Sequence, residues 1–424
     1  MALLRMAVEN YRCFKERQEI DLAPITVVLG KNNSGKSAIT RLPLLLQTGI
    51  HTTSSLPLDL DALGDDPPDY LDLVHGRNVH RALRLEFVAG GAKRSVEVKA
   101  KIQNIAERQI QFVSELDVVD GRHHLRLEWL ASDPGQSYVM TLDNEPSVEV
   151  AVEWRGLVPV LTSAPDPNRP SGHWFNDLRY DVPRCFDGIR YLSAYRQRPS
   201  RLTRLPSRHA DDVGSAGEHA AGMLVNDHVR GDRVLLDQVN RLIGDNLEGW
   251  RLEIEPQGRL YSINLRSLAT PDLSVNLLDS GTGVAQVLPL LVQRAYEMVH
   301  KEAGQRRTLH VIEEPELHLH PAFHALLADL FIAGARQGTG GLLIETHSET
   351  MLLRLRRRIA EGQISPRDVA VYFVHHGAGS SRVRRIEIDD FGNLDYWPAG
   401  VFSEDFEETK KLAEAQFTRG NNED

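Results

Sequence analysis

Cysteine is scarce in this sequence: Cys13 and Cys185 are the only two among 424 residues. Two cysteines cannot form a disulfide framework, so we expect both thiols to be reduced. No apolar run approaches the roughly 20 residues that a membrane-spanning helix needs, and a membrane partner is therefore not expected. The N-terminal segment MALLRMAVENYRCF also lacks the apolar core and the cleavage site of a signal peptide. These absences predict a cytoplasmic protein.

Basic residues are in the minority, with 49 Lys and Arg against 59 Asp and Glu and a formal net charge of -10. This balance argues against a protein that coats nucleic acid by bulk electrostatic attraction alone. A local basic face is still compatible with it, because arginines cluster twice along the chain. The alternative for each cluster is a solvated helix or loop surface. The clusters are Arg196, Arg198, Arg201, Arg204 and Arg208, and Arg354, Arg356, Arg357 and Arg358.

The segment after the apolar run Ile25 to Leu29 has the form of a P-loop, GKNNSGKS. A strand pattern precedes it and a helical pattern follows from Lys36, which is the context that a P-loop requires. Backbone amides of residues 31 to 36 would cradle phosphates, Lys36 would face the β- and γ-phosphates, and the Ser37 hydroxyl would ligate Mg²⁺. The predicted ATP-binding residues of the loop are Gly30, Asn32, Asn33, Ser34, Gly35, Lys36 and Ser37.

A second motif, HVIEEPE, places two carboxylates at the end of an apolar run. P-loop ATPases use such a pair beside the phosphates, one for the magnesium shell and one for the attacking water. We assign Glu313 to Mg²⁺ and Glu314 to the water. Without a P-loop in the same chain, a charged strand end facing solvent would be the better interpretation.

A third motif, DSGTG, directly precedes a helical pattern. Small residues at a helix N-terminus expose amides and a hydroxyl that suit a γ-phosphate. Because the chain already has one phosphate cradle, the simplest use of Ser280, Gly281 and Gly283 is in trans, across a two-fold dimer. The alternative is an ordinary glycine-rich turn that caps a helix.

Histidine occurs in two further motifs. In ETHSE, His347 follows a buried strand pattern and could contact a γ-phosphate or the lytic water. The His318 and His320 pair suggests a metal site, but no carboxylate and histidine set at zincin spacing accompanies it. We therefore expect this pair to serve packing or a dimer contact.

The order of these motifs resembles that of ABC-type ATPase heads of the RecF, SMC and OLD group. The resemblance rests on NYRCFKERQEIDLAPITVVLGKNNSGKS, LLDSGTGVAQVLPLL, IEEPELHLHP and LLIETHSE, about a third of the chain. It is greatest to compact bacterial OLD-like ATPases of the AAA family. It implies that Arg12 can lie near the nucleotide and that a Q-loop glutamine exists, for which Gln47 and Gln197 are candidates. Glu313 stands where many relatives have Asp.

The resemblance implies an α/β P-loop fold of ABC-type head architecture, with a mixed or parallel core sheet, an antiparallel β subdomain and a helical subdomain. Period-two alternation between about residues 82 and 155 independently predicts the antiparallel region. The expected division is as follows: residues 1–50, the N-terminal part of the core with the P-loop; 51–200, a β-rich insertion and return to the core; 201–275, a helical and β subdomain; 276–400, the C-terminal part of the core; 401–424, a tail.

The predicted function is an ATP-hydrolysing switch that dimerises, or forms a higher homo-oligomer, with ATP at the interface. OLD proteins carry a Toprim nuclease domain after the ATPase, and too few residues follow His347 for one here. We therefore expect a regulatory ATPase of a bacterial anti-phage defence system that controls a separately encoded, nuclease-like effector. The alternative is a RecF-like repair ATPase that acts directly on DNA. A transporter subunit fits the DSGTG and IEEPE motifs poorly, and an inactive site is disfavoured by Lys36, Glu314 and His347.

Overall fold

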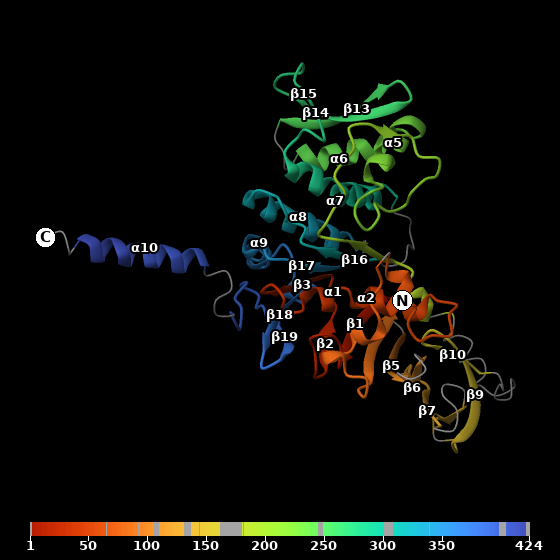
Figure 1. Cartoon of the computed structure of the whole chain (residues 1–424). Coiled ribbons are helices and arrows are strands. Elements are labelled where there is room, and N and C mark those ends of the chain that lie inside the picture. The colour runs from red at the N-terminus through yellow and green to blue at the C-terminus, as the bar shows by residue number, and fades with distance from the viewer. Residues whose placement is uncertain are drawn as a thin grey trace.

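The computed structural model describes residues 2–64, 66–91, 94–105, 110–130, 137–143, 145–161, 180, 182–244, 249–300, 308–338, 340–397 and 404–420. Three sheets organise these residues, and helices separate the sheets (Figure 1). None of the described helices is long and apolar enough to cross a membrane.

The largest sheet is antiparallel and has the strand order β10-β9-β8-β7-β6-β5-β4-β1-β2. Its strands are β1 (Ala2–Glu9), β2 (Gln18–Asp21), β4 (Leu83–Gly91), β5 (Arg94–Ile105), β6 (Ile110–Val119), β7 (His124–Trp129), β8 (Ser137–Leu142), β9 (Val148–Arg155) and β10 (Val158–Leu161). Alternating burial along β7 and β9 agrees with a sheet that packs on one face and meets solvent on the other. The predicted antiparallel region is thus confirmed, and it also takes in β1 and β2.

The central sheet has the order β11-β16-β17-β3-β18-β19 and is parallel except for its last pair. Its strands are β3 (Ile25–Gly30), β11 (Ile189–Leu192), β16 (Thr308–Glu313), β17 (Gly340–Glu345), β18 (Val369–Gly377) and β19 (Ser380–Ile386). A smaller sheet contains β12 (Thr203–Arg204), β13 (Trp250–Gln257), β14 (Leu260–Ser267) and β15 (Ser274–Asn276). Because parallel strands present their carboxyl ends at one edge, the segments after β3, β16 and β17 meet there.

Helices lie on both sides of the central sheet, as is usual for a parallel sheet. The helices are α1 (Lys36–Thr40), α2 (Leu42–Ile50), α3 (Tyr70–Leu73), α5 (Ala220–Arg230), α6 (Val234–Gly244), α7 (Thr282–Val299), α8 (Pro321–Gln337), α9 (Glu349–Ala360) and α10 (Glu404–Gly420), with 3₁₀ turns at η1 (Leu60–Leu63), η2 (His75–Arg77) and η3 (Pro366–Asp368). Helices α5, α6 and α7 and the small sheet form a lobe above the central sheet in Figure 1.

Two hydrophobic cores lie on opposite faces of the central sheet. Along β3, Val28 belongs to one core, whereas Val27 and Leu29 belong to the other. The same alternation on β17 puts Leu343 in the first core and Leu342 in the second. Side chains of a strand point alternately to either face, so both faces of this sheet are covered. The P-loop strand is therefore fixed from both sides.

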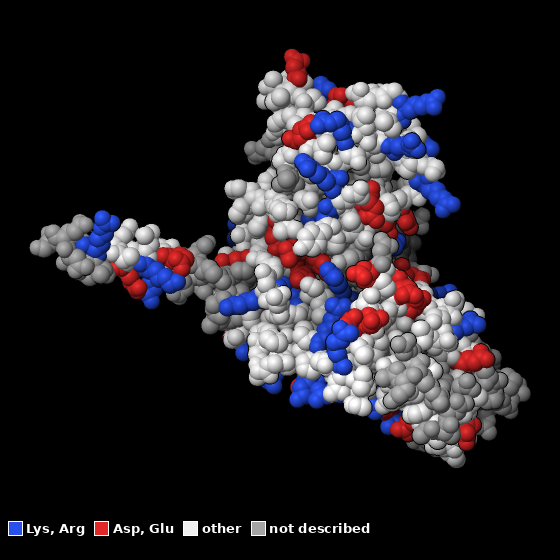
Figure 2. Space-filling view, viewed as in Figure 1, with Lys and Arg blue, Asp and Glu red and all other residues white. Residues whose placement is uncertain are grey.

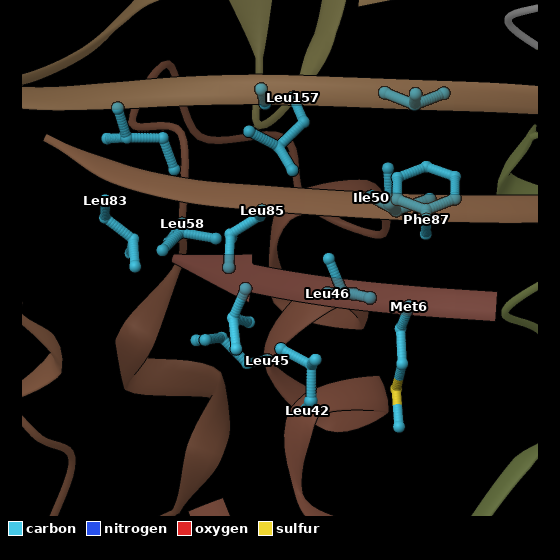
Figure 3. Packing of buried hydrophobic residues seen from close by; sticks show 14 of the residues in the cluster. Met6, Leu42, Leu45, Leu46, Ile50, Leu58, Leu83, Leu85, Phe87 and Leu157 are labelled. Atoms are coloured by element: carbon cyan, nitrogen blue, oxygen red, sulfur yellow. The ribbon is translucent and has the colours of Figure 1, made fainter. Parts of the chain in front are cut away.

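Helix α2 fills the space between the antiparallel sheet and the central sheet. Its buried residues Leu42, Leu45 and Leu46 follow the i, i+3, i+4 spacing of one helix face. In Figure 3 they lie close to Met6 of β1 and to Leu85 of β4. This packing connects the antiparallel sheet to the helix that continues from the P-loop.

Two features differ from the sequence-based expectation. Strand β10 lies beyond the predicted antiparallel region, which ends at about residue 155, and it adds one edge strand to that sheet. Within the expected tail, the described residues 404–420 form helix α10, which projects from the body in Figure 1. Ion pairs between Lys411 and Glu408 and between Lys410 and Glu414, at i, i+3 and i, i+4, favour this helix.

Candidate functional site

The P-loop connects β3 to α1, as the sequence predicts. Gly30 ends the strand, and Gly35 caps the helix with φ 105°, in the left-handed region that favours glycine. A Cβ on Gly30 would collide with the carbonyl oxygen of Val374, and one on Gly35 with the thiol of Cys13. Both glycines are therefore required by close packing around the loop. The loop itself presents Asn32 and Asn33 to solvent.

Two side chains of the loop are buried. The Ser34 hydroxyl has no hydrogen-bond partner among the described residues. The Lys36 Nζ donates to the Lys31 carbonyl at 3.0 Å. Burial lowers the pKa of Lys36, while Glu345, Glu314 and Glu316 act in the opposite direction. A buried ammonium and an unpartnered hydroxyl beneath exposed amides fit a phosphate chain, because phosphate oxygens would satisfy both.

Glu313, the residue predicted for Mg²⁺, ends β16 and is engaged by a guanidinium. The Arg41 Nε and Nη2 atoms donate to its two oxygens at 2.5 and 2.7 Å, and the Tyr191 hydroxyl donates at 3.0 Å. Glu313 raises the pKa of Arg41 through these hydrogen bonds, and burial raises that of Tyr191. The side chain of Glu313 is only 4% exposed. Its magnesium role stays a prediction, since the carboxylate is already paired.

The Ser37 hydroxyl contacts a different carboxylate. It donates to Glu345 Oε1 at 2.9 Å, and the Thr40 hydroxyl donates to Glu345 Oε2 at 2.9 Å. Burial is the main cause that raises the pKa of Glu345. Sequence reasoning did not assign this residue a role, although a carboxylate at the end of a buried parallel strand was a usable signal. The fit to Mg²⁺ is good, because a hydroxyl and buried carboxylates are the oxygen donors that this cation takes.

Glu314 and His347 lie side by side at the ends of β16 and β17. The His347 Nε2 is 3.9 Å from Glu314 Oε1, and the Glu314 amide donates to the Glu345 carbonyl at 2.8 Å. Glu314 has φ 41°, an uncommon backbone conformation for a residue other than glycine, and such strain is common at functional sites. Burial, and next the charge of Lys36, lower the pKa of His347. A neutral imidazole beside a carboxylate suits a site that orients water.

Glu316 fixes the spacing of this pair. Its Oε1 accepts from the Thr346 hydroxyl and from the His347 amide, both at 2.7 Å. The loop after β16 is thereby tied to the loop after β17. The sequence motif contained Glu316, but its contact depends on strand order and could not be predicted from spacing.

Arg196 is buried beneath the loop after β16 and does not form part of a basic surface. Its Nη2 donates to the carbonyls of Glu313 and Glu314 at 3.1 and 3.3 Å, and its Nη1 donates to the Gln286 carbonyl of α7 at 3.2 Å. Burial lowers the pKa of Arg196 to about 10. One guanidinium thus holds the strained Glu314 backbone against α7.

We expect Arg196→Met to destabilise this arrangement. Loss of the guanidinium removes three hydrogen bonds to backbone carbonyls, which should reduce the free energy of unfolding by about 1–3 kcal/mol. Urea titration followed by circular dichroism measures this loss. Arg198→Met is the matched control, because Arg198 is exposed and lies two residues away. Equal unfolding midpoints for the two variants would contradict the assigned role.

The second predicted cradle lies at the start of α7. Ser280 donates to the Leu277 carbonyl at 2.7 Å, and Gly281 is the N-cap of the helix. A Cβ on Gly283 would lie 3.2 Å from the His318 carbonyl, so the turn packs against the loop after β16. Within the described residues, Ser280 makes no hydrogen bond to the P-loop. The cradle is formed locally, and its use in trans stays a prediction.

Arg12 lies on the turn between β1 and β2, next to Cys13. Its amide donates to the Leu73 carbonyl at 2.7 Å, and its carbonyl oxygen is 2.8 Å from the His75 Nδ1. With Arg41 it lines a groove of about 850 Å³. Arg12 therefore lies near the P-loop helix, and its contact with a nucleotide stays a prediction.

The two glutamine candidates for a Q-loop differ in position. Gln47 donates to the Phe186 carbonyl at 3.0 Å and serves packing. Gln197 lies on the segment that leaves β11 at the carboxyl edge of the central sheet. Both glutamines therefore stay candidates for the Q-loop.

The remaining motifs have local partners. His320 caps α8 by accepting from the Ala322 amide, and His318 has φ 65°. Groups of three or more His, Cys, Asp or Glu that could hold a metal ion are absent from the described part of the chain. Of the second arginine cluster, Arg354 and Arg358 pair with Asp329. Basic and acidic side chains are interspersed on the face in Figure 2.

Comparison with known proteins identifies the family to which the chain belongs. Residues 1–108 and 236–352, more than half of the chain, match the family described as AAA ATPase domain. Residues 364–412 match a family described as a protein of unknown function, DUF3696. No curated protein gives a significant match.

Solved structures of low identity also align with the chain. The SMC head domain from Thermotoga maritima is 12% identical, with a TM-score of 0.43 and coverage of 92% of this chain and 100% of that one. An SmcHead bound to the C-winged helix domain of ScpA is 13% identical, with a TM-score of 0.47 and coverage of 91% and 98%. An Smc head domain with an extended coiled coil, bound to the C-terminal domain of ScpA derived from Pyrococcus furiosus, is 13% identical, with a TM-score of 0.43 and coverage of 98% and 99%.

Proposed function

The chain belongs to the AAA ATPase domain family, and on that basis we propose that it is an ATP-hydrolysing switch whose nucleotide sites are completed by a second copy. The observation that carries the proposal is the meeting of three strand ends. The P-loop after β3, Glu314 after β16 and His347 after β17 lie at one edge of the central sheet.

Each residue has a distinct task in the proposed hydrolysis. Lys36 and the loop amides bind the phosphates, and Mg²⁺ held at Ser37 would supply charge neutralisation. Glu314 accepts the proton of the attacking water, whose oxygen bonds to the γ-phosphorus while the bond between that phosphorus and the ADP oxygen breaks. The neutral His347 donates a hydrogen bond and restricts the water position. Arg196 and Glu316 keep the two loops in place.

The position of the second cradle supports the proposed dimerisation. Ser280 and Gly281 belong to the lobe of α7, and their contacts are within that lobe. If they bind the γ-phosphate of another copy, two nucleotides lie in an isologous interface. Binding then favours the closed dimer, and hydrolysis releases it.

A mixing experiment tests the trans arrangement. We expect Lys36→Ala and Ser280→Arg to lack ATPase activity separately. In a mixed dimer one site carries both changes and the other carries neither. Random mixing should therefore restore up to about a quarter of wild-type activity, because half of the dimers are mixed and each has one intact site. Absence of any restoration under conditions where the mixed dimer is isolated would refute sites shared between copies.

The output of the switch is proposed to be control of a separately encoded effector in anti-phage defence, as the resemblance to OLD-like ATPases implies. Co-purification with a nuclease-like protein encoded beside it would test this role. Direct action on DNA receives less support, because Arg354 and Arg358 are occupied by Asp329.

A further inference from the structure

Glu345 lies between the P-loop and the two carboxylates of the IEEPE motif. Its strand, β17, lies between the carboxylate strand β16 and the P-loop strand β3. In the register, Glu345 is opposite Glu313 on one side and Val28 on the other. The residue is 3% exposed. A carboxylate so placed lies closer to the P-loop helix than one on β16, because β17 is the immediate neighbour of β3.

The two buried carboxylates differ in their partners. Glu313 is matched by the fork of Arg41, so its charge is compensated. Glu345 receives hydrogen bonds from the hydroxyls of Ser37 and Thr40, and it forms no ion pair with any described residue. Buried carboxylates are normally paired with a cation or bind a metal ion. Glu345 is therefore a buried carboxylate that no cation of the described residues pairs within 4.0 Å, which leaves it available to a magnesium shell.

The Ser37 hydroxyl connects Glu345 to the predicted cation. A hydroxyl that donates its proton to Glu345 keeps its lone pairs free for a metal ion. The hydrogen bond also fixes the side-chain rotamer, as partners of metal ligands generally do. We propose that Glu345, through the Ser37 hydroxyl, is the carboxylate that shapes the magnesium shell, and that Glu313 instead positions Arg41 and Tyr191. The proposal rests on the proposed ATP-binding function and adds a residue to that site.

A purely mechanical role for Glu345 predicts a different outcome. Through Thr40 the carboxylate also fastens α1 to β17. If fastening were its whole task, removing the Thr40 hydroxyl would have the same effect as removing the charge. Thr40→Val is therefore the matched control, because it removes the hydrogen bond to Glu345 and leaves the carboxylate.

The test compares the affinity for a fluorescent ATP analogue in saturating Mg²⁺ and in EDTA. The ratio of the two affinities measures the gain that Mg²⁺ provides. For Glu345→Gln we expect this gain to fall about 10- to 100-fold, the usual cost of losing a partner of a metal ligand. Affinity in EDTA should stay equal or rise, since a negative charge near the phosphates is lost. Thr40→Val and Glu313→Gln should keep most of the gain.

Three results would overturn the proposal: a full Mg²⁺ gain in Glu345→Gln, an equal loss in Thr40→Val, or a larger loss in Glu313→Gln. Glu345→Asp, which retains the charge, should keep part of the gain and provides a second variant should the Gln variant fold poorly. A wild-type chain that binds no analogue would overturn the proposed ATP-binding function itself, and with it this inference. A wild-type chain that binds the analogue, together with a full Mg²⁺ gain in Glu345→Gln, would overturn this inference alone.

Discussion

Lys36→Ala is expected to abolish ATP hydrolysis and to weaken ATP binding by about 10- to 100-fold, the equivalent of losing one charged hydrogen bond of about 1.5–3 kcal/mol. The lysine is buried under the P-loop, where its Nζ already contacts the Lys31 carbonyl. Water cannot replace the ammonium there, so the phosphate charge would stay uncompensated. Alanine favours the helical conformation, and α1 should therefore persist.

Equilibrium binding of a fluorescent ATP analogue and phosphate release measure the two effects of Lys36→Ala. Lys99→Ala on β5 is the control, because Lys99 is exposed and lies on the antiparallel sheet. Lys99→Ala should change neither the affinity for the ATP analogue nor the rate of phosphate release. Retention of wild-type affinity in Lys36→Ala, with an unchanged circular dichroism spectrum, would contradict the assignment of the loop as the phosphate cradle.

The loop geometry was predictable from the sequence because its determinants are local. Gly35 acts through its left-handed backbone conformation at the start of α1, and Lys36 acts through the Lys31 carbonyl five positions away. The same holds for Ser280 and Gly281, which form a helix N-terminus with their own neighbours. The conformation of such motifs is set mainly by neighbouring residues, and the structure has the P-loop and the start of α7 at the predicted positions.

Contacts between strands could not be predicted in the same way. Arg41 reaches Glu313 across 272 positions, and Ser37 reaches Glu345 across 308. Both contacts depend on β17 lying between β3 and β16, a strand order that spacing does not reveal. Arg196 was grouped with neighbouring arginines on charge alone, and only its burial separates it from them. The assignment of carboxylates to roles therefore required the sheet topology.

Glu314→Gln is expected to separate ATP binding from hydrolysis. Glutamine keeps the size and hydrogen-bonding capacity of glutamate but cannot accept the proton of the attacking water. Loss of a general base typically lowers the rate about 10²- to 10⁴-fold. Lys36 and the loop amides are untouched, so the affinity for ATP should be retained. The expected product is an ATP-loaded state that persists, and with it the closed dimer.

Sedimentation velocity with and without ATP, combined with phosphate release, measures both consequences of Glu314→Gln. Glu387→Gln is the control, since Glu387 is exposed and forms an ion pair with Arg385 of the edge strand β19. The backbone of Glu314 is held by two contacts, so the variant tests the carboxylate alone. Because Arg196 holds its carbonyl and Glu345 holds its amide, the side chain alone changes in the variant while the loop stays in place. A variant that stays monomeric at saturating ATP would refute the dimer switch, and one that still releases phosphate at the wild-type rate would move the catalytic base to another residue.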